Sequence, residues 1–166
     1  KQLWFNLNQL CESDAGFNDK LEIRLSGNID TEVLKYIYQF PHLEKKVLYL
    51  GYLSHQEVLM EYHKCSLLLL LLFNSDSGKG NYPGKIFEYF AANKPILAFG
   101  PEESDVQKLI TETDTGIYLN YNETNNLQEY IMRIFNNKDV VNTSVVKSRF
   151  ARKNLTSDLS NLLKRI

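Results

Sequence analysis

The feature that most limits the possible folds of this chain is an uninterrupted apolar run at residues 67–73, six leucines followed by Phe73. A strand with one face in water alternates apolar and polar residues, whereas a parallel strand covered by helices on both faces is apolar throughout. The run is far shorter than the roughly 20 apolar residues of a membrane helix. We therefore predict a buried, central strand of a parallel sheet.

The rest of the chain alternates short apolar runs with helical periodicity. Further strands are predicted at residues 21–25, 47–50, 96–99 and 116–119. Helices are predicted at residues 1–11, 33–38, 54–62, 83–93, from 104, at 127–135 and at 155–166. Strands joined by helices imply a doubly wound parallel sheet, with ligands bound beyond the carboxyl ends of its strands. The prediction is a three-layer, Rossmann-like α/β fold that forms a single domain over residues 1–166.

Charge and cysteine content exclude several classes of protein. The 19 Lys and Arg residues and 20 Asp and Glu residues leave a net charge of −1, so no basic field is present to bind nucleic acid. Cys11 and Cys65 each lie in an apolar helical pattern, which is typical of free thiols in a reducing compartment, and we expect a cytoplasmic location. His42, His55 and His63 have no metal-binding spacing with these thiols, so no metal site is predicted.

The segment from Asn74 to Lys85 is long, polar and rich in glycine, and it connects the most apolar strand to a helix. Backbone N–H groups, the helix dipole and a lysine suit a phosphate or diphosphate there. Pro83 stands where a dinucleotide fingerprint needs glycine, and the spacing from Gly80 to Lys85 is one residue too short for a P-loop. The sequence thus argues against a P-loop NTPase and a Rossmann dehydrogenase.

Glu88 lies one turn into the helix that follows, three residues after Lys85. A carboxylate in that place can accept two hydrogen bonds from a vicinal diol such as ribose. The alternative is that Glu88 pairs with Lys85 on a solvated helix face, because ion pairs at this spacing are common. The residues alone leave both interpretations open.

Residues 83–98, PGKIFEYFAANKPILA, resemble the P-x-K-x-x-E-Y-x-A-x-x-K-P-hydrophobic signature of a known family. That family is the retaining, GT-B fold glycosyltransferases of the glycosyl transferases group 1 type, and the signature belongs to their C-terminal domain. Residues 47–57 and 66–73 are similar to two further segments of the same domain. The resemblance covers about residues 21–120.

The resemblance implies that this chain binds the donor, a nucleoside diphosphate sugar. It implies that Glu88 binds the ribose hydroxyls and that Gly84 and Lys85 form the turn at the diphosphate. The first Glu of the family's E-x7-E motif would fall at Gly80, so its role near the donor sugar is left to Asp76 or to a backbone N–H.

Gly51, Tyr52 and Leu53 match the family's loop along the nucleobase. No residue is assigned a catalytic role, and neither a cofactor nor a metal is expected. The implied activity of the full-length protein is transfer of a hexose from the donor to a polysaccharide or lipid-linked acceptor with retention of configuration.

The chain departs from the family at its start. By the resemblance, its first residues are expected to form the helix that follows the family's first strand and diphosphate clamp, and the acceptor-binding N-terminal domain is expected to lie outside this sequence. We therefore expect a fragment without transferase activity of its own. Because the family's first strand lies in the middle of the sheet, its neighbours would either pair directly or leave a gap.

Two other functions remain open: a nucleotide-sugar epimerase of the same fold and a non-catalytic flavodoxin-like or receiver-like module. A receiver would need clustered Asp residues after Leu25 and Leu50, and neither place has them. A basic cluster near the C-terminus could face an anionic membrane in the full-length protein, although a solvated helix face is the favoured interpretation. Its members are Lys147, Arg149, Arg152 and Lys153. The base, sugar, acceptor and oligomeric state are not indicated.

Overall fold

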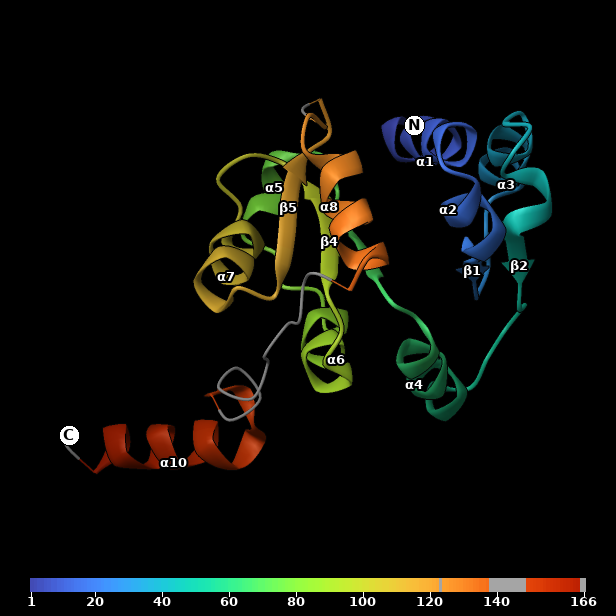
Figure 1. Cartoon of the computed structure of the whole chain (residues 1–166). Coiled ribbons are helices and arrows are strands. Elements are labelled where there is room, and N and C mark those ends of the chain that lie inside the picture. The colour runs from blue at the N-terminus through green and yellow to red at the C-terminus, as the bar shows by residue number, and fades with distance from the viewer. Residues whose placement is uncertain (123, 138–148, 165–166) are drawn as a thin grey trace. The chain divides into compact units, whose positions relative to one another are not determined.

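The structure is a computed structural model and describes residues 1–122, 124–137 and 149–164 (Figure 1). The chain divides into two compact units, which are described separately. Unit 1 comprises residues 1–61 and 121–138, and unit 2 comprises residues 62–120 and 139–166. The boundary falls within helix α4 (His55–Lys64). The single domain over residues 1–166 stays a prediction.

Unit 1 contains a parallel pair of short strands, β1 (Ile23–Leu25) and β2 (Val47–Tyr49), in which Ile23 lies opposite Val47. Its helical segments are α1 (Gln2–Ser13), α2 (Ala15–Lys20), α3 (Thr31–Tyr38), the 3-10 helix η1 (Glu44–Lys46) and α8 (Leu127–Phe135). Helix α8 buries Leu127, Ile131 and Ile134, which are spaced by about one turn each. The amphipathic pattern of this helix was thus correctly interpreted.

Short polar residues begin two helices of unit 1. The side chain of Asp14 accepts a hydrogen bond from the N–H of Phe17 at 2.8 Å and thereby caps α2. Asp30 caps α3 in the same way through the N–H of Glu32. The sequence predicted only a break between residues 13 and 16, and it missed α2 because that break is itself a helix cap.

Unit 2 contains a parallel three-stranded sheet in the order β3-β4-β5. The strands are β3 (Leu68–Leu71), β4 (Ile96–Gly100) and β5 (Gly116–Asn120). Every residue of the central strand β4 is buried. Helices α5 (Asp76–Lys79), α6 (Lys85–Ala92), α7 (Asp105–Thr113) and α10 (Arg152–Leu163) belong to the same unit.

The predicted central position of the 67–73 strand is wrong for this sheet. Strand β3 pairs with β4 on one side and forms the edge of the three-stranded sheet. Leu71 is 58% exposed and Phe73 is 79% exposed. A uniformly apolar run indicates which side chains avoid water, but it does not indicate how many strands pair with the backbone, so the run could not separate a central strand from an edge.

The predicted α/β class is confirmed: parallel strands alternate with helices in a Rossmann-like arrangement. The five described strands form two sheets, β1-β2 in unit 1 and β3-β4-β5 in unit 2. How the expected missing strand is compensated stays open.

The core of unit 2 lies where α6 and α7 pack against the sheet. It consists of Leu68, Leu70, Leu72, Ile86, Tyr89, Phe90, Ala92, Ile96, Ala98, Val106, Leu109 and Ile110. Phe150 stacks on Phe90 with ring centroids 5.8 Å apart. In contrast, the four leucines of α10 remain 47–61% exposed, so the expected closing helix forms without burying its apolar stripe. These are Leu155, Leu159, Leu162 and Leu163.

Candidate functional site

The predicted diphosphate site lies between the carboxyl end of β3 and the start of α6. The connection was predicted as an irregular polar loop, but residues 76–79 form the short helix α5 within it. Helix α6 begins at Lys85, with Gly84 as its N-cap residue and with no capping side chain. Ile86 and Phe87 donate the first backbone hydrogen bonds, to Pro83 and Gly84. The N–H groups of Gly84 and Lys85 therefore precede the helical ladder and suit an anion.

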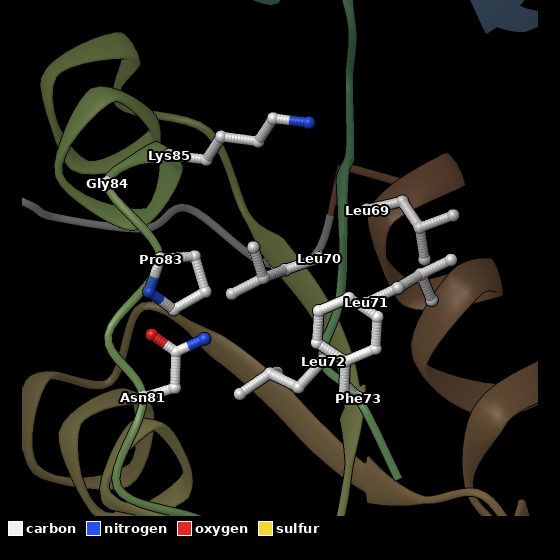
Figure 2. Close-up of a pocket in the computed structure, with 9 residues that line it drawn as sticks. All are labelled: Leu69, Leu70, Leu71, Leu72, Phe73, Asn81, Pro83, Gly84 and Lys85. Atoms are coloured by element: carbon white, nitrogen blue, oxygen red, sulfur yellow. The ribbon is translucent and has the colours of Figure 1, made fainter. Parts of the chain in front are cut away.

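A pocket of about 460 Å³ lies beside these N–H groups. One side is formed by residues 69–73, at the end of β3 and just after it, and the other by Asn81, Pro83, Gly84 and Lys85. Figure 2 shows the Lys85 side chain extending from α6 toward β3. The pocket thus combines an apolar wall with the Lys85 ammonium group and the positive end of a helix dipole.

Glu88 is half-buried on the next turn of α6, and it does not form an ion pair with Lys85 in the described part of the chain. The hydroxyl of Tyr62, on α4, donates a hydrogen bond to Glu88 Oε2 at 3.3 Å. The solvated-pair interpretation is therefore not what the structure shows. Glu88 is a carboxylate held by a neighbouring helix, with its position set by a tertiary contact.

Two tyrosines surround this carboxylate. The rings of Tyr62 and Tyr89 meet edge to face, with centroids 5.0 Å apart and an interplanar angle of 83°. Burial, together with the negative charge of Glu88, raises the pKa of Tyr62 to about 12. Burial also raises the pKa of Tyr89. Tyr62 therefore stays protonated at neutral pH and remains a hydrogen-bond donor to Glu88.

Gly80 and Asp76, the two positions considered for the role of the family's first motif Glu, are both exposed. Asp76 is on α5 with its side chain 97% exposed, and it pairs with Lys79 at 3.2 Å. Gly80 ends α5 and is exposed, and a Cβ atom at this position would meet no atom within 4 Å. The prediction that Asp76 or a backbone N–H takes over this role stays a prediction.

The predicted nucleobase loop belongs to unit 1, whereas Gly84, Lys85 and Glu88 belong to unit 2. Gly51 has φ +66°, a left-handed conformation that favours glycine. Its carbonyl accepts a hydrogen bond from the N–H of Gly27 at 2.7 Å, which joins the loops that follow β2 and β1. Tyr52 is 91% exposed and Leu53 is half-buried. Their role at a nucleobase stays a prediction.

Sequence reasoning did not assign Tyr62, Asn81 and Phe73 to the site. Tyr62 was recognised only as a member of an inward helical stripe, because the sequence does not reveal that its hydroxyl meets a residue 26 positions later. Asn81 lay within the polar loop that was predicted to bind phosphate, so the polar composition of that loop could have pointed to Asn81. Phe73 was assigned to the core as the end of the apolar run.

The basic cluster is only partly described. Lys147 lies outside the described residues, as does the side chain of Arg152. Arg149 pairs with Glu112 at 3.7 Å and lies over the ring of Phe150, and Lys153 is exposed. Within the described ranges, no helix is both long enough and apolar enough to span a membrane. In the same residues, no three His, Cys, Asp or Glu side chains form a group that could hold a metal ion.

Comparison with known proteins identifies a similar fold. No protein-family model matches the chain, and no curated protein matches it in sequence. Among solved structures, it is similar to the crystal structure of Anabaena Alr3699/HepE in complex with UDP, with a TM-score of 0.69 and 15% sequence identity. The match covers 98% of this chain and 45% of the Anabaena chain, so the present chain spans less than half of that protein. At this identity the likeness shows the Rossmann-like fold.

Proposed function

We propose that this chain binds the nucleoside diphosphate part of a sugar donor and forms the donor-binding half of a retaining glycosyltransferase. One observation carries the proposal: the free N–H groups at the start of α6 and Lys85 border a pocket of about 460 Å³, and the Glu88 carboxylate follows on the next turn of the same helix, held by Tyr62. The presence of UDP in the structurally similar Anabaena protein supports the same ligand class.

The proposed roles follow from the chemistry of each group. The N–H groups of Gly84 and Lys85, with the Lys85 ammonium, bind the diphosphate and stabilise its charge when it becomes the leaving group. Glu88 accepts hydrogen bonds from the ribose hydroxyls. Because fixed positive charge is supplied by the helix and by lysine, we propose that no metal is needed for binding. Cys11 and Cys65 are not joined in a disulfide, which favours the cytoplasmic location that we propose.

The whole protein is proposed to move a hexose to a polysaccharide or lipid-linked acceptor. An acceptor-binding N-terminal domain would complete it, in keeping with the 45% share of the Anabaena chain that is matched. Residues 1–166 by themselves are then expected to bind donor without transferring sugar. Sugar transfer by this chain alone would contradict that division of roles.

The proposal is tested by isothermal titration of the chain with UDP and with GDP. Wild type is expected to bind one of the two at up to millimolar concentration, and Glu88→Ala and Lys85→Ala are each expected to weaken binding by about tenfold, which is about 1.4 kcal/mol. Lys94→Ala is the matched control, because Lys94 follows the opposite end of the same helix. Absence of nucleotide binding by wild type, or equal losses in Lys85→Ala and Lys94→Ala, would refute the site.

A further inference from the structure

Two hydrogen bonds and one ring contact connect the backbone of β3 to the Glu88 carboxylate. This path begins with Tyr89, which is 6% exposed and whose hydroxyl donates to the carbonyl oxygen of Leu69 at 3.0 Å. The Tyr89 ring packs edge to face on the ring of Tyr62. The Tyr62 hydroxyl then donates to Glu88 Oε2. Each group is therefore fixed by the one before it, and the path ends at Glu88, the residue proposed to bind the ribose hydroxyls.

This path bears on how Glu88 presents its two oxygens. Glutamate has three side-chain torsions, and a half-exposed Glu on a helix surface ordinarily samples several rotamers. Tyr62 occupies Oε2, and no other side chain of the described residues donates to Oε1. A carboxylate held through one oxygen keeps the other oxygen available to a ligand. Because the side chain is already restricted in the free protein, ligand binding loses less conformational entropy.

We propose that Tyr62 is a positioning residue that orients Glu88 for a ribose diol, and this inference rests on the proposed function. Tyr62 would not contact the nucleotide itself. Its hydroxyl holds Oε2 so that Oε1 faces the ligand.

The test compares UDP with 2′,3′-dideoxy-UDP, which lacks both ribose hydroxyls. Wild type is expected to prefer UDP, and Glu88→Ala is expected to abolish the preference. Tyr62→Phe keeps the ring that packs on Tyr89 and removes only the hydroxyl. It is expected to weaken UDP binding by about three- to tenfold and to leave dideoxy-UDP binding unchanged. A purely structural role would weaken binding of both nucleotides equally, and that result would overturn the proposal.

A double variant separates action through Glu88 from any direct contact. If Tyr62 acts only through the carboxylate, Tyr62→Phe in the Glu88→Ala background changes UDP affinity no further. Additive losses would overturn the positioning role. Tyr89→Phe is the companion variant, because it releases the anchor on Leu69 while leaving the Tyr62 hydroxyl in place.

The outcomes also separate this inference from the proposed function. Wild-type UDP binding that is lost in Glu88→Ala but unaltered in Tyr62→Phe would reject the role of Tyr62 and keep the donor site. Wild type that binds UDP and dideoxy-UDP equally would reject the ribose role of Glu88 together with this inference, and wild type that binds none of UDP, dideoxy-UDP and GDP would reject the donor site as well.

Discussion

Gly78→Ala is expected to destabilise unit 2 because this glycine packs directly on the end of the strand that lines the pocket. Gly78 is buried in α5, and a Cβ atom there would lie 2.2 Å from the carbonyl oxygen of Phe73 and 3.2 Å from its carbonyl carbon. The first distance is more than 1 Å shorter than an ordinary contact of about 3.4 Å. Because the obstructing atoms are backbone, either α5 or the segment that follows β3 must move.

Overpacking of this kind costs about 1–3 kcal/mol. For a protein of this size, each kcal/mol lowers the Tm by roughly 2–4 °C, so Gly78→Ala is expected to melt roughly 2–12 °C below wild type. Gly80→Ala is the matched control, two residues away, since a Cβ at Gly80 meets nothing within 4 Å. It is expected to be neutral, or to stabilise by up to about 1 kcal/mol through the unfolded state. Thermal unfolding followed by circular dichroism measures both, and equal Tm values for the two variants would refute the close approach of Gly78 to Phe73.

Three further predictions concern caps and buried hydroxyls. Ser104→Ala should lower stability by about 1–3 kcal/mol in urea unfolding, because the fully buried Ser104 Oγ accepts from the N–H of Gln107 and donates to Tyr118. Tyr118→Phe should cost about 1–3 kcal/mol, since its hydroxyl donates to the carbonyl of Pro101 at 2.7 Å; the exposed Tyr82→Phe should change stability by less than about 0.5 kcal/mol. Hydrogen bonds from Ser54 lower the pKa of Glu57 below its ordinary 4.5, so its stabilising effect is present above pH 4.5 and is lost as the pH falls through the folded-state pKa. The difference in urea midpoint between wild type and Glu57→Gln should accordingly be present at pH 7 and shrink at about pH 3, whereas a constant difference would contradict the capping role.

Local rules predicted the helix starts well. Ser54 and Glu57 form the predicted reciprocal cap, with the Ser54 N–H donating to Glu57 Oε2 at 2.8 Å and the Glu57 N–H donating to Ser54 Oγ at 3.4 Å. At the second predicted cap, Ser104 accepts from Gln107 as expected, but Gln107 Oε1 accepts from the N–H of Glu103. The donor to Gln107 is thus one residue earlier than a capping box predicts. Glu103 has a positive φ of 59°, which sequence periodicity does not reveal.

The exposed apolar surfaces could not be predicted from the sequence. Periodicity placed the α10 leucines on one side of a helix, and the apolar run placed Leu71 and Phe73 in a strand. Both statements are local, whereas burial depends on which other elements pack against that side. The same limit applies to β3, whose neighbours along the sheet are set by topology and not by its own residues.

Some residues of the candidate site could be predicted from local sequence, whereas others depend on tertiary contacts. Lys85 and Glu88 were predicted from their spacing on one short helix, and Gly84 from the family resemblance of the turn before it, so local sequence was enough to propose all three. Tyr62 was not identified, because α4 reaches α6 only through the fold. If the carboxylate must be held to bind a ribose, the contiguous motif is then insufficient on its own. A chain that keeps Glu88 but carries Phe at position 62 should fold, retain the anion-binding turn and discriminate poorly between ribose and dideoxyribose.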